Sequence, residues 1–156
     1  TAVMEKVAKT LEEMEKEAAK IVQDAIKKHT ENSALIIGLR GDLGAGKTVF
    51  VKAAAREFGI EEVVTSPTFV IEKIYKLSRQ KHAFLVHIDA YRLGSCEEMN
   101  HIGWDSIKKD PQNIIFVEWA DHVEACMPET TVWVTIEHKD AFTRTLHHGN
   151  KKRGKK

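Results

Sequence analysis

Residues 34–48 read ALIIGLRGDLGAGKT, an apolar run that leads into a glycine-rich loop. The loop, from Gly41 to Thr48, matches the pattern G-x-x-x-x-G-K-[ST]. In this pattern, successive backbone N–H groups turn inward around phosphate oxygens, which glycine permits and a bulky side chain resists. The apolar run is typical of a buried strand, and residues 48–58 carry apolar side chains at helical spacing. The stretch therefore predicts a phosphate-binding loop between a strand and the N-terminus of a helix.

This loop supplies most of the candidate binding residues. Lys47 would reach the β- and γ-phosphates of a nucleotide, and the Thr48 hydroxyl would ligate Mg²⁺. The other loop candidates for contact with the nucleotide are Asp42, Leu43, Gly44, Ala45 and Gly46. The guanine-reading motif Asn-Lys-x-Asp is absent from the sequence, and residues 89–92 (DAYR) lack the glycine of a GTPase second switch. ATP is therefore the expected nucleotide, with Mg²⁺ as its metal ion.

Two carboxylates are candidates for the metal and for catalysis. In proteins with this loop, such a carboxylate usually follows a neighbouring buried strand. Asp89 follows the apolar stretch 84–88, and Glu118 follows the stretch 114–117. We expect both near the phosphates, as metal ligands or as catalytic residues together with Lys47. The spacing does not decide which of them contacts the metal ion and which positions a water molecule.

The rest of the chain alternates helical and strand-like patterns without an internal repeat. Apolar residues at every third or fourth position predict an amphipathic helix over residues 3–28 that packs on a sheet. Further strands are expected at 69–77, 83–88, 113–117, 132–138 and 142–147, and a helix at 95–108. This order predicts an α/β fold, a P-loop NTPase-like three-layer sandwich with a mainly parallel central sheet and an antiparallel C-terminal portion.

Composition and charge exclude several classes of protein. The 156 residues are 42% apolar and 30% charged, which suits one domain over residues 1–150 and excludes a collagen-like or wholly disordered chain. Residues 151–156 contain five Lys or Arg and form a basic tail that we expect to be disordered. Without this tail the formal net charge falls from +1 to −4, which argues against DNA binding.

The sequence also indicates where the protein works. No apolar run approaches the roughly 20 residues that a membrane span needs, and the N-terminus lacks the pattern of a secretory signal. Two cysteines, Cys96 and Cys126, do not make the disulfide framework of a small secreted scaffold, and the cysteines and histidines show no zinc-finger spacing. We therefore expect ordinary cysteines and histidines in a cytoplasmic protein.

Four motifs together resemble one family. They are GDLGAGKT at 41–48, SPTF at 66–69, HIDAYRL at 87–93 and VEW at 117–119. In this order and spacing they resemble the TsaE (YjeE) family of small bacterial P-loop ATPases, over roughly residues 34–128. The resemblance implies weak ATP hydrolysis by the chain alone and action with the partners TsaB and TsaD. Those partners transfer a threonylcarbamoyl group to adenosine 37 of tRNAs that read ANN codons, so tRNA contact would be indirect.

The resemblance also assigns residues. It implies that Asp89 and Glu118 are the family's two acidic positions at the nucleotide, with Glu118 the first choice for Mg²⁺ or water and Trp119 beside it. Residues 65–68 resemble a switch-like segment, whose Ser66 and Thr68 would sense the γ-phosphate. Arg144 stands where the family has a late arginine near the nucleotide. The N-terminal segment is longer and more charged than the family's, which leaves the contacts to adenine unassigned.

Two other functions remain open. A small-molecule kinase uses the same loop, but such kinases usually carry an arginine-rich lid, and Arg40, Arg56, Arg79 and Arg92 are scattered along the chain. A nucleotide-gated adaptor would bind its partner in an ATP-dependent manner without significant hydrolysis. The sequence does not separate this adaptor from a partner-stimulated ATPase.

Overall fold

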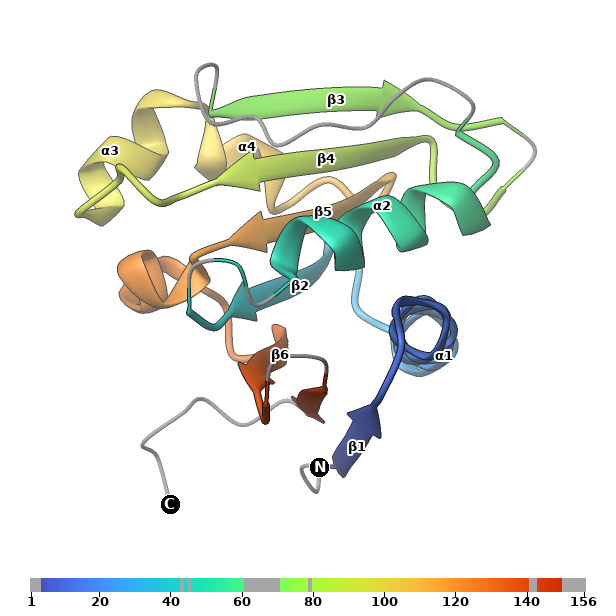
Figure 1. Cartoon of the computed structure of the whole chain (residues 1–156). Coiled ribbons are helices and arrows are strands. Elements are labelled where there is room, and N and C mark those ends of the chain that lie inside the picture. The colour runs from blue at the N-terminus through green and yellow to red at the C-terminus, as the bar shows by residue number, and fades with distance from the viewer. Residues whose placement is uncertain are drawn as a thin grey trace.

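The computed structural model of the chain describes residues 4–42, 44, 46–60, 71–78, 80–140 and 143–149. Its strands are β1 (Met4–Ala8), β2 (Leu35–Arg40), β3 (Glu72–Lys76), β4 (Phe84–Asp89), β5 (Asn113–Glu118), β6 (Val132–His138) and β7 (Arg144–Gly149). Its helices are α1 (Leu11–Lys28), α2 (Lys47–Glu57), α3 (Cys96–His101), α4 (Trp104–Ile107) and the 3₁₀ helix η1 (Ala120–Cys126). Within the described residues the seven strands form one sheet in the order β1-β7-β6-β2-β5-β4-β3 (Figure 1).

The centre of the sheet is parallel, as predicted. Strand β2 pairs in parallel with β5 and β6, and β4 pairs in parallel with β5. Strands β2 and β5 are buried along their whole length and are mainly apolar, because helices cover both faces of the sheet there. Antiparallel pairing occurs at both edges of the sheet, with β6, β7 and β1 on one side and β3 against β4 on the other. The antiparallel edge at β3 goes beyond the sequence prediction, which placed antiparallel strands only near the C-terminus.

Two cores lie on opposite faces of the sheet and make the predicted three layers. Side chains of a strand alternate between the faces, and the strands divide accordingly. The core that contains α1 and α2 takes Leu35, Ile37 and Leu39 from β2 and Ile114 and Phe116 from β5. The core that contains α3, α4 and η1 takes Ile36 from β2 and Ile115 and Val117 from β5. The α/β sandwich expected from the sequence is therefore confirmed.

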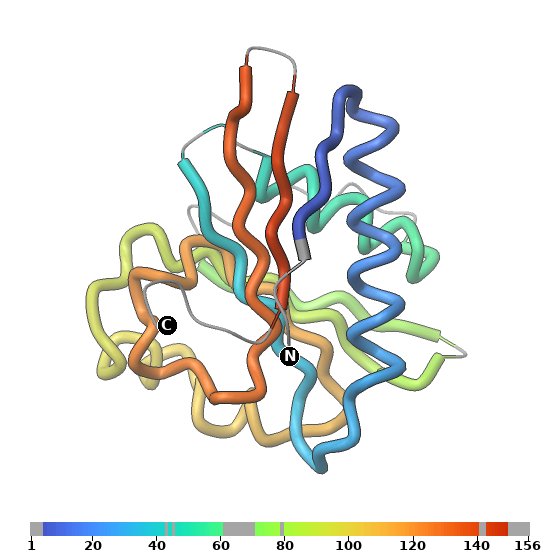
Figure 2. Tube along the Cα trace, turned by 90° about the horizontal axis from the view of Figure 1, so that it is seen from below, coloured from blue at the N-terminus to red at the C-terminus, as the bar shows by residue number. Residues whose placement is uncertain are grey.

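The N-terminal segment differs from the prediction of one helix over residues 3–28. Residues 4–8 form β1, which pairs antiparallel with β7 (Figure 2), and α1 begins only at Leu11. Thr10 caps the helix, because its hydroxyl accepts the N–H of Glu13 at 3.0 Å, while the Glu13 carboxylate accepts the N–H of Lys9. The strand forms because it pairs with the backbone of β7, a long-range partner that the local apolar spacing does not indicate.

The helical stretch expected at residues 95–108 is present, but it consists of two short helices. Ser95 caps α3 by accepting the N–H of Glu98 at 3.2 Å. Gly103 adopts a φ of +82°, in the left-handed region, and separates α3 from α4. A left-handed residue ends a helix, so the chain turns between the two helices and α4 places Trp104 in the core.

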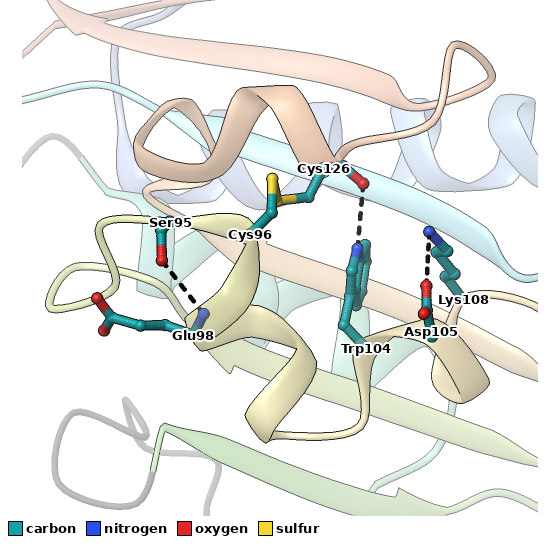
Figure 3. Close-up of a disulfide and its surroundings, with 7 residues drawn as sticks. All are labelled: Ser95, Cys96, Glu98, Trp104, Asp105, Lys108 and Cys126. Atoms are coloured by element: carbon teal, nitrogen blue, oxygen red, sulfur yellow. Dashed lines mark hydrogen bonds and ion pairs between the residues drawn. A yellow bond between two sulfur atoms is a disulfide. The ribbon is translucent and has the colours of Figure 1, made fainter.

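Cys96 and Cys126 form a disulfide that joins α3 to η1 (Figure 3). The expectation of ordinary cysteines is therefore wrong. Thirty positions separate the two residues, but the packing of α3 on η1 brings their Cα atoms to 5.4 Å, within the usual range for a disulfide. The indole N–H of Trp104 donates to the carbonyl of Cys126 at 3.1 Å and ties α4 to the same point.

No helix of the described part of the chain is both long enough and apolar enough to cross a bilayer. The basic tail at 151–156 lies outside the described residues.

Candidate functional site

The glycine-rich loop connects β2 to α2 at the carboxyl end of the parallel strands, as the sequence predicts. Two of its glycines are required by geometry. Gly41 has a φ of +148°, and a Cβ atom there would lie 2.1 Å from the carbonyl oxygen of Ile136. Gly46 has a φ of +116° immediately before the first residue of α2. These are conformations that residues with a side chain rarely adopt. Of the predicted loop residues, Leu43 and Ala45 lie outside the described residues.

Lys47 is held by its own loop and by an aromatic ring. Its ammonium group donates to the carbonyl of Gly41 at 2.6 Å and to the carbonyl of Asp42 at 2.9 Å. It also lies over the Trp119 ring, with Nζ 3.8 Å from the ring centroid. Burial lowers the pKa of Lys47, and the nearby carboxylates, Glu118 first, oppose this shift.

The carboxylate of Glu118 connects a half-buried hydroxyl, that of Thr48, to a buried imidazole, that of His87. Its Oε1 accepts the hydroxyl of Thr48 at 2.9 Å, and its Oε2 lies 2.5 Å from Nε2 of His87. The Glu118 residue is 3% exposed. Each carboxylate oxygen therefore has its own partner, one on α2 and one on β4, and the group is fixed beside the start of α2.

Asp89 lies next to Glu118 in the sheet, because the two are register partners at the ends of β4 and β5. Its Oδ1 accepts the N–H of Tyr91 at 3.0 Å, and the residue is 7% exposed. The two candidate carboxylates thus lie side by side with different contacts. Glu118 contacts the hydroxyl of the phosphate loop, whereas Asp89 supports the turn that follows β4.

Three aromatic rings gather where β5 ends. The ring centroids of Tyr91 and Trp119 are 5.0 Å apart, and those of Trp119 and His122 are 5.1 Å apart. Trp119 has a φ of +57°, which is uncommon for a residue with a large side chain. Such strain persists only where the surrounding structure holds it, and here it places the indole over Lys47.

A cavity of about 180 Å³ lies on the other side of the loop, between α1, the start of α2 and β7. It is lined by Ala8, Thr10, Leu11, Met14, Gly44, Gly46, Val49 and Arg144. Arg144 is a binding residue predicted from the family resemblance, which left the contacts to adenine unassigned. Thr10, Leu11 and Met14, which line the same cavity, were not predicted from the sequence. The signal that could have found them is the capping pattern Thr10-x-x-Glu13, which places the helix start at this point.

Comparison with known proteins adds an independent observation. Residues 8–146 match the family model described as "Threonylcarbamoyl adenosine biosynthesis protein TsaE". The chain belongs to the TsaE family. This match extends to β1 and to β7, beyond the stretch of residues 34–128 over which the sequence motifs resemble the family.

Individual TsaE proteins agree with the family match. The chain is 35% identical to the tRNA threonylcarbamoyladenosine biosynthesis protein TsaE of Treponema pallidum, over 74% of this chain and 77% of that protein. It is 32% identical to the TsaE of Haemophilus influenzae, over 78% of this chain and 73% of that one. The crystal structure of Bacillus subtilis YdiB superposes with a TM-score of 0.71 and 26% identity, over 94% of this chain and 84% of that chain.

Three of the four motifs that resemble the TsaE family meet at one place among the described residues. Lys47, Thr48, Glu118 and Trp119 are connected by direct contacts, and Asp89 is the neighbour of Glu118 in the sheet. Arg144 lies on the opposite side of the loop, at the cavity. Ser66 and Thr68 of the predicted switch-like segment lie outside the described residues, so their role stays a prediction. The contact of His87 with Glu118 was not predicted from the sequence.

Proposed function

We propose that the chain is an ATP-binding and ATP-hydrolysing subunit of tRNA threonylcarbamoyladenosine synthesis. The observation that carries this proposal is the contact between Thr48 of the phosphate loop and Glu118 at the end of β5. It joins the loop that would hold the phosphates to the carboxylate that would act on them, in a member of the TsaE family. The cofactors implied are ATP and Mg²⁺.

The described residues around the loop fit the parts of ATP. The phosphates would lie along the loop backbone from Asp42 to Gly46 and against Lys47, at the N-terminus of α2, where the helix dipole favours negative charge. The base would enter the cavity between α1 and β7, against the apolar side chains of Leu11 and Met14. Arg144 lines this cavity and would contact the nucleotide from β7.

The donor set fits Mg²⁺. Thr48 offers a hydroxyl oxygen and Glu118 a carboxylate oxygen 2.9 Å away, and oxygen donors are those that Mg²⁺ prefers. Among the described residues, no three His, Cys, Asp or Glu side chains gather as a ligand cluster. This suits Mg²⁺, which is usually held by one or two protein groups together with substrate phosphates and water. When bound, Mg²⁺ would neutralise charge on the phosphates.

Hydrolysis would then depend on positioning by this chain's own groups. Lys47 would leave the carbonyls of Gly41 and Asp42 and place its charge against the oxygens of the γ-phosphate. Glu118 would hold the metal ion or orient the attacking water, and Asp89, its neighbour in the sheet, would assist from β4. Ser66 and Thr68 would respond to the γ-phosphate.

The proposed role includes partners. The chain would act in the cytoplasm with a TsaB–TsaD complex, which would modify adenosine 37 of tRNAs reading ANN codons. Nucleotide state at the loop would change the contacts with this complex, and tRNA would be reached through it, without contact to DNA. The membership in the TsaE family and the arrangement of Lys47, Thr48 and Glu118 support this proposal.

The test measures Mg²⁺-dependent ATP hydrolysis by the purified chain, alone and with a bacterial TsaB–TsaD pair and tRNA. We expect slow hydrolysis alone and a higher rate with the partners. Hydrolysis that requires an added nucleoside or metabolite acceptor would indicate a kinase instead. Partner binding that needs ATP, with tRNA modification unchanged in a hydrolysis-deficient Glu118→Gln variant, would indicate an adaptor.

A further inference from the structure

His87 is a buried polar residue on β4, between the edge strand β3 and β5. It lies on β4 with 0% exposure, and its register partner on β5 is Phe116. Because side chains alternate along strands, His87 and Asp89 point to the same face of β4, and Phe116 and Glu118 point to that face of β5. His87 and Glu118 are therefore diagonal neighbours on the face covered by α2, which allows contact between their side chains.

The hydrogen bond between these residues defines the role of each nitrogen of the ring. Nε2 lies 2.5 Å from Oε2 of Glu118. An ionised carboxylate can only accept hydrogen bonds, so Nε2 carries the hydrogen and donates it. Nδ1 is buried and has no hydrogen-bond partner in the described part of the chain. The bond to Glu118 is thus the polar contact that distinguishes the imidazole from an apolar side chain at this buried position.

The position of Glu118 depends on this donor. The terminal torsion of a glutamate is broad and nearly two-fold, so a single bond leaves its carboxylate free to turn. Thr48 holds Oε1 and His87 holds Oε2, and together they fix both oxygens. Loss of either partner would release one side of the carboxylate.

We propose that His87 is a positioning residue for the metal-dependent reaction: its Nε2–H holds Oε2 of Glu118, so that Oε1 is presented to Thr48 and to Mg²⁺. This inference rests on the proposed function, since it assigns a task to a group that supports Glu118. Partners of this kind, which orient a group that binds metal, commonly change metal affinity or activity 10- to 100-fold when they are lost.

A pair of amide variants tests the donor at Nε2 separately from burial. The amide nitrogen of Gln reaches about as far as Nε2 of histidine, whereas that of Asn ends near the position of Nδ1. We expect His87→Gln to retain the orientation of Glu118 and His87→Asn to lose it. Both replace a buried imidazole by a neutral amide, so general effects on folding are similar in the two proteins.

The readout is the affinity for ADP measured by calorimetry with and without Mg²⁺, together with the rate of ATP hydrolysis. In His87→Asn, we expect the gain in affinity from Mg²⁺ to fall at least tenfold, with unchanged binding of ADP alone. The hydrolysis rate should fall by a similar factor, and His87→Gln should remain within about threefold of the parent chain.

His82→Leu is the matched control. His82 is also a buried histidine, 2% exposed, and it precedes β4 at the end remote from Asp89. The variant His82→Leu should leave the gain in ADP affinity from Mg²⁺ unchanged. Equal losses in His87→Gln and His87→Asn, or no loss in either, would overturn the positioning role. Failure of the proposed function can be told apart from failure of the positioning role, because the parent chain itself would then show no Mg²⁺-dependent nucleotide binding.

Discussion

The ammonium group of Lys47 lies 3.8 Å from the centroid of the Trp119 ring, so the lysine of the phosphate loop packs on the residue that follows Glu118. Two loop carbonyls accept its hydrogen bonds at the same time. A cation over an indole ring gains roughly 0.5–2 kcal/mol. On the proposed function, a bound phosphate would replace these contacts, and we expect Lys47 to leave the ring when nucleotide binds.

This relationship predicts an optical signal. Addition of ATP and Mg²⁺ should change the tryptophan fluorescence, because Lys47 leaves the Trp119 ring. The other two tryptophans, Trp104 and Trp133, are buried in the core that contains α3, α4 and η1, on the face of the sheet opposite α2. The change should disappear in Trp119→Phe, which keeps an aromatic ring over Lys47. A change of equal size in that variant would show that another tryptophan reports the binding.

The contacts of the two carboxylates predict unequal roles. Glu118→Gln removes the charge beside Thr48 and should lower the rate of hydrolysis about 100- to 1,000-fold, the usual effect of losing one group that stabilises the transition state electrostatically. Asp89→Asn should lower it less, since Asp89 supports the turn at Tyr91. The measurement is the steady-state rate at saturating ATP and Mg²⁺. If Asp89→Asn lowered the hydrolysis rate more than Glu118→Gln, Asp89 and not Glu118 would be the main catalytic carboxylate.

Lys47→Ala tests the loop itself. It removes the charge expected at the β- and γ-phosphates, so nucleotide affinity should fall at least tenfold and hydrolysis should be abolished. Calorimetric titration with ATP and Mg²⁺ measures the affinity. Lys52→Ala serves as a control, because Lys52 is an exposed lysine on the same helix. Equal affinities of the two variants would contradict the role of Lys47.

The disulfide predicts a redox-dependent stability. The cross-link between Cys96 and Cys126 closes a loop of 30 positions, for which the chain-entropy relation gives about 3.6 kcal/mol of stabilisation. Reduction should lower the free energy of unfolding by about this amount in urea denaturation. The double variant Cys96→Ser with Cys126→Ser should have the lower stability with or without reductant. Equal stability of the oxidised chain and the double variant would show that the bond contributes nothing.

His82 predicts a change of stability with pH. Burial, followed by the positive charges of Lys81 and His29, lowers the pKa of His82 below its ordinary value of 6.5. In the unfolded chain His82 takes up a proton as the pH falls through about 6.5, while the folded chain resists it. The unfolded state therefore binds more protons in this window, and the free energy of unfolding decreases as the pH falls.

The measurement compares urea denaturation at pH 7.5 and pH 5.5. The parent chain should lose more stability between these values than His82→Leu, which cannot take up this proton. Parallel losses in the two proteins would show that His82 does not titrate differently in the folded and unfolded states.

The sequence predicted those parts of the fold that depend on local pattern. The loop at 41–48 and the apolar runs that precede Asp89 and Glu118 identified the parallel centre, because these strands are buried on both faces. The apolar spacing at residues 3–28 did not reveal β1, since the pairing of Val7 with Thr145 is a long-range contact. Gly103 was a local signal for the break between α3 and α4, and it was overlooked.

The candidate site was predictable as a set of motifs and not as a set of contacts. The strand pattern placed Asp89 and Glu118 at two strand ends without choosing between them, and the family resemblance favoured Glu118. The structure adds the 2.9 Å contact of Glu118 with Thr48, and which carboxylate contacts the metal ion stays a prediction. The contact of His87 depends on strand register, which the sequence alone does not give. The disulfide between Cys96 and Cys126 depends on the packing of α3 against η1, for which a separation of 30 positions in the sequence gives no signal.

The most direct test of the proposed function measures threonylcarbamoyladenosine formed in tRNA by a TsaB–TsaD pair with ATP, Mg²⁺ and a supply of the threonylcarbamoyl donor. We expect the parent chain to support modification over many turnovers and Lys47→Ala and Glu118→Gln not to support it. Modification that proceeds equally well without this chain, or with Lys47→Ala in its place, would contradict the role of its phosphate loop.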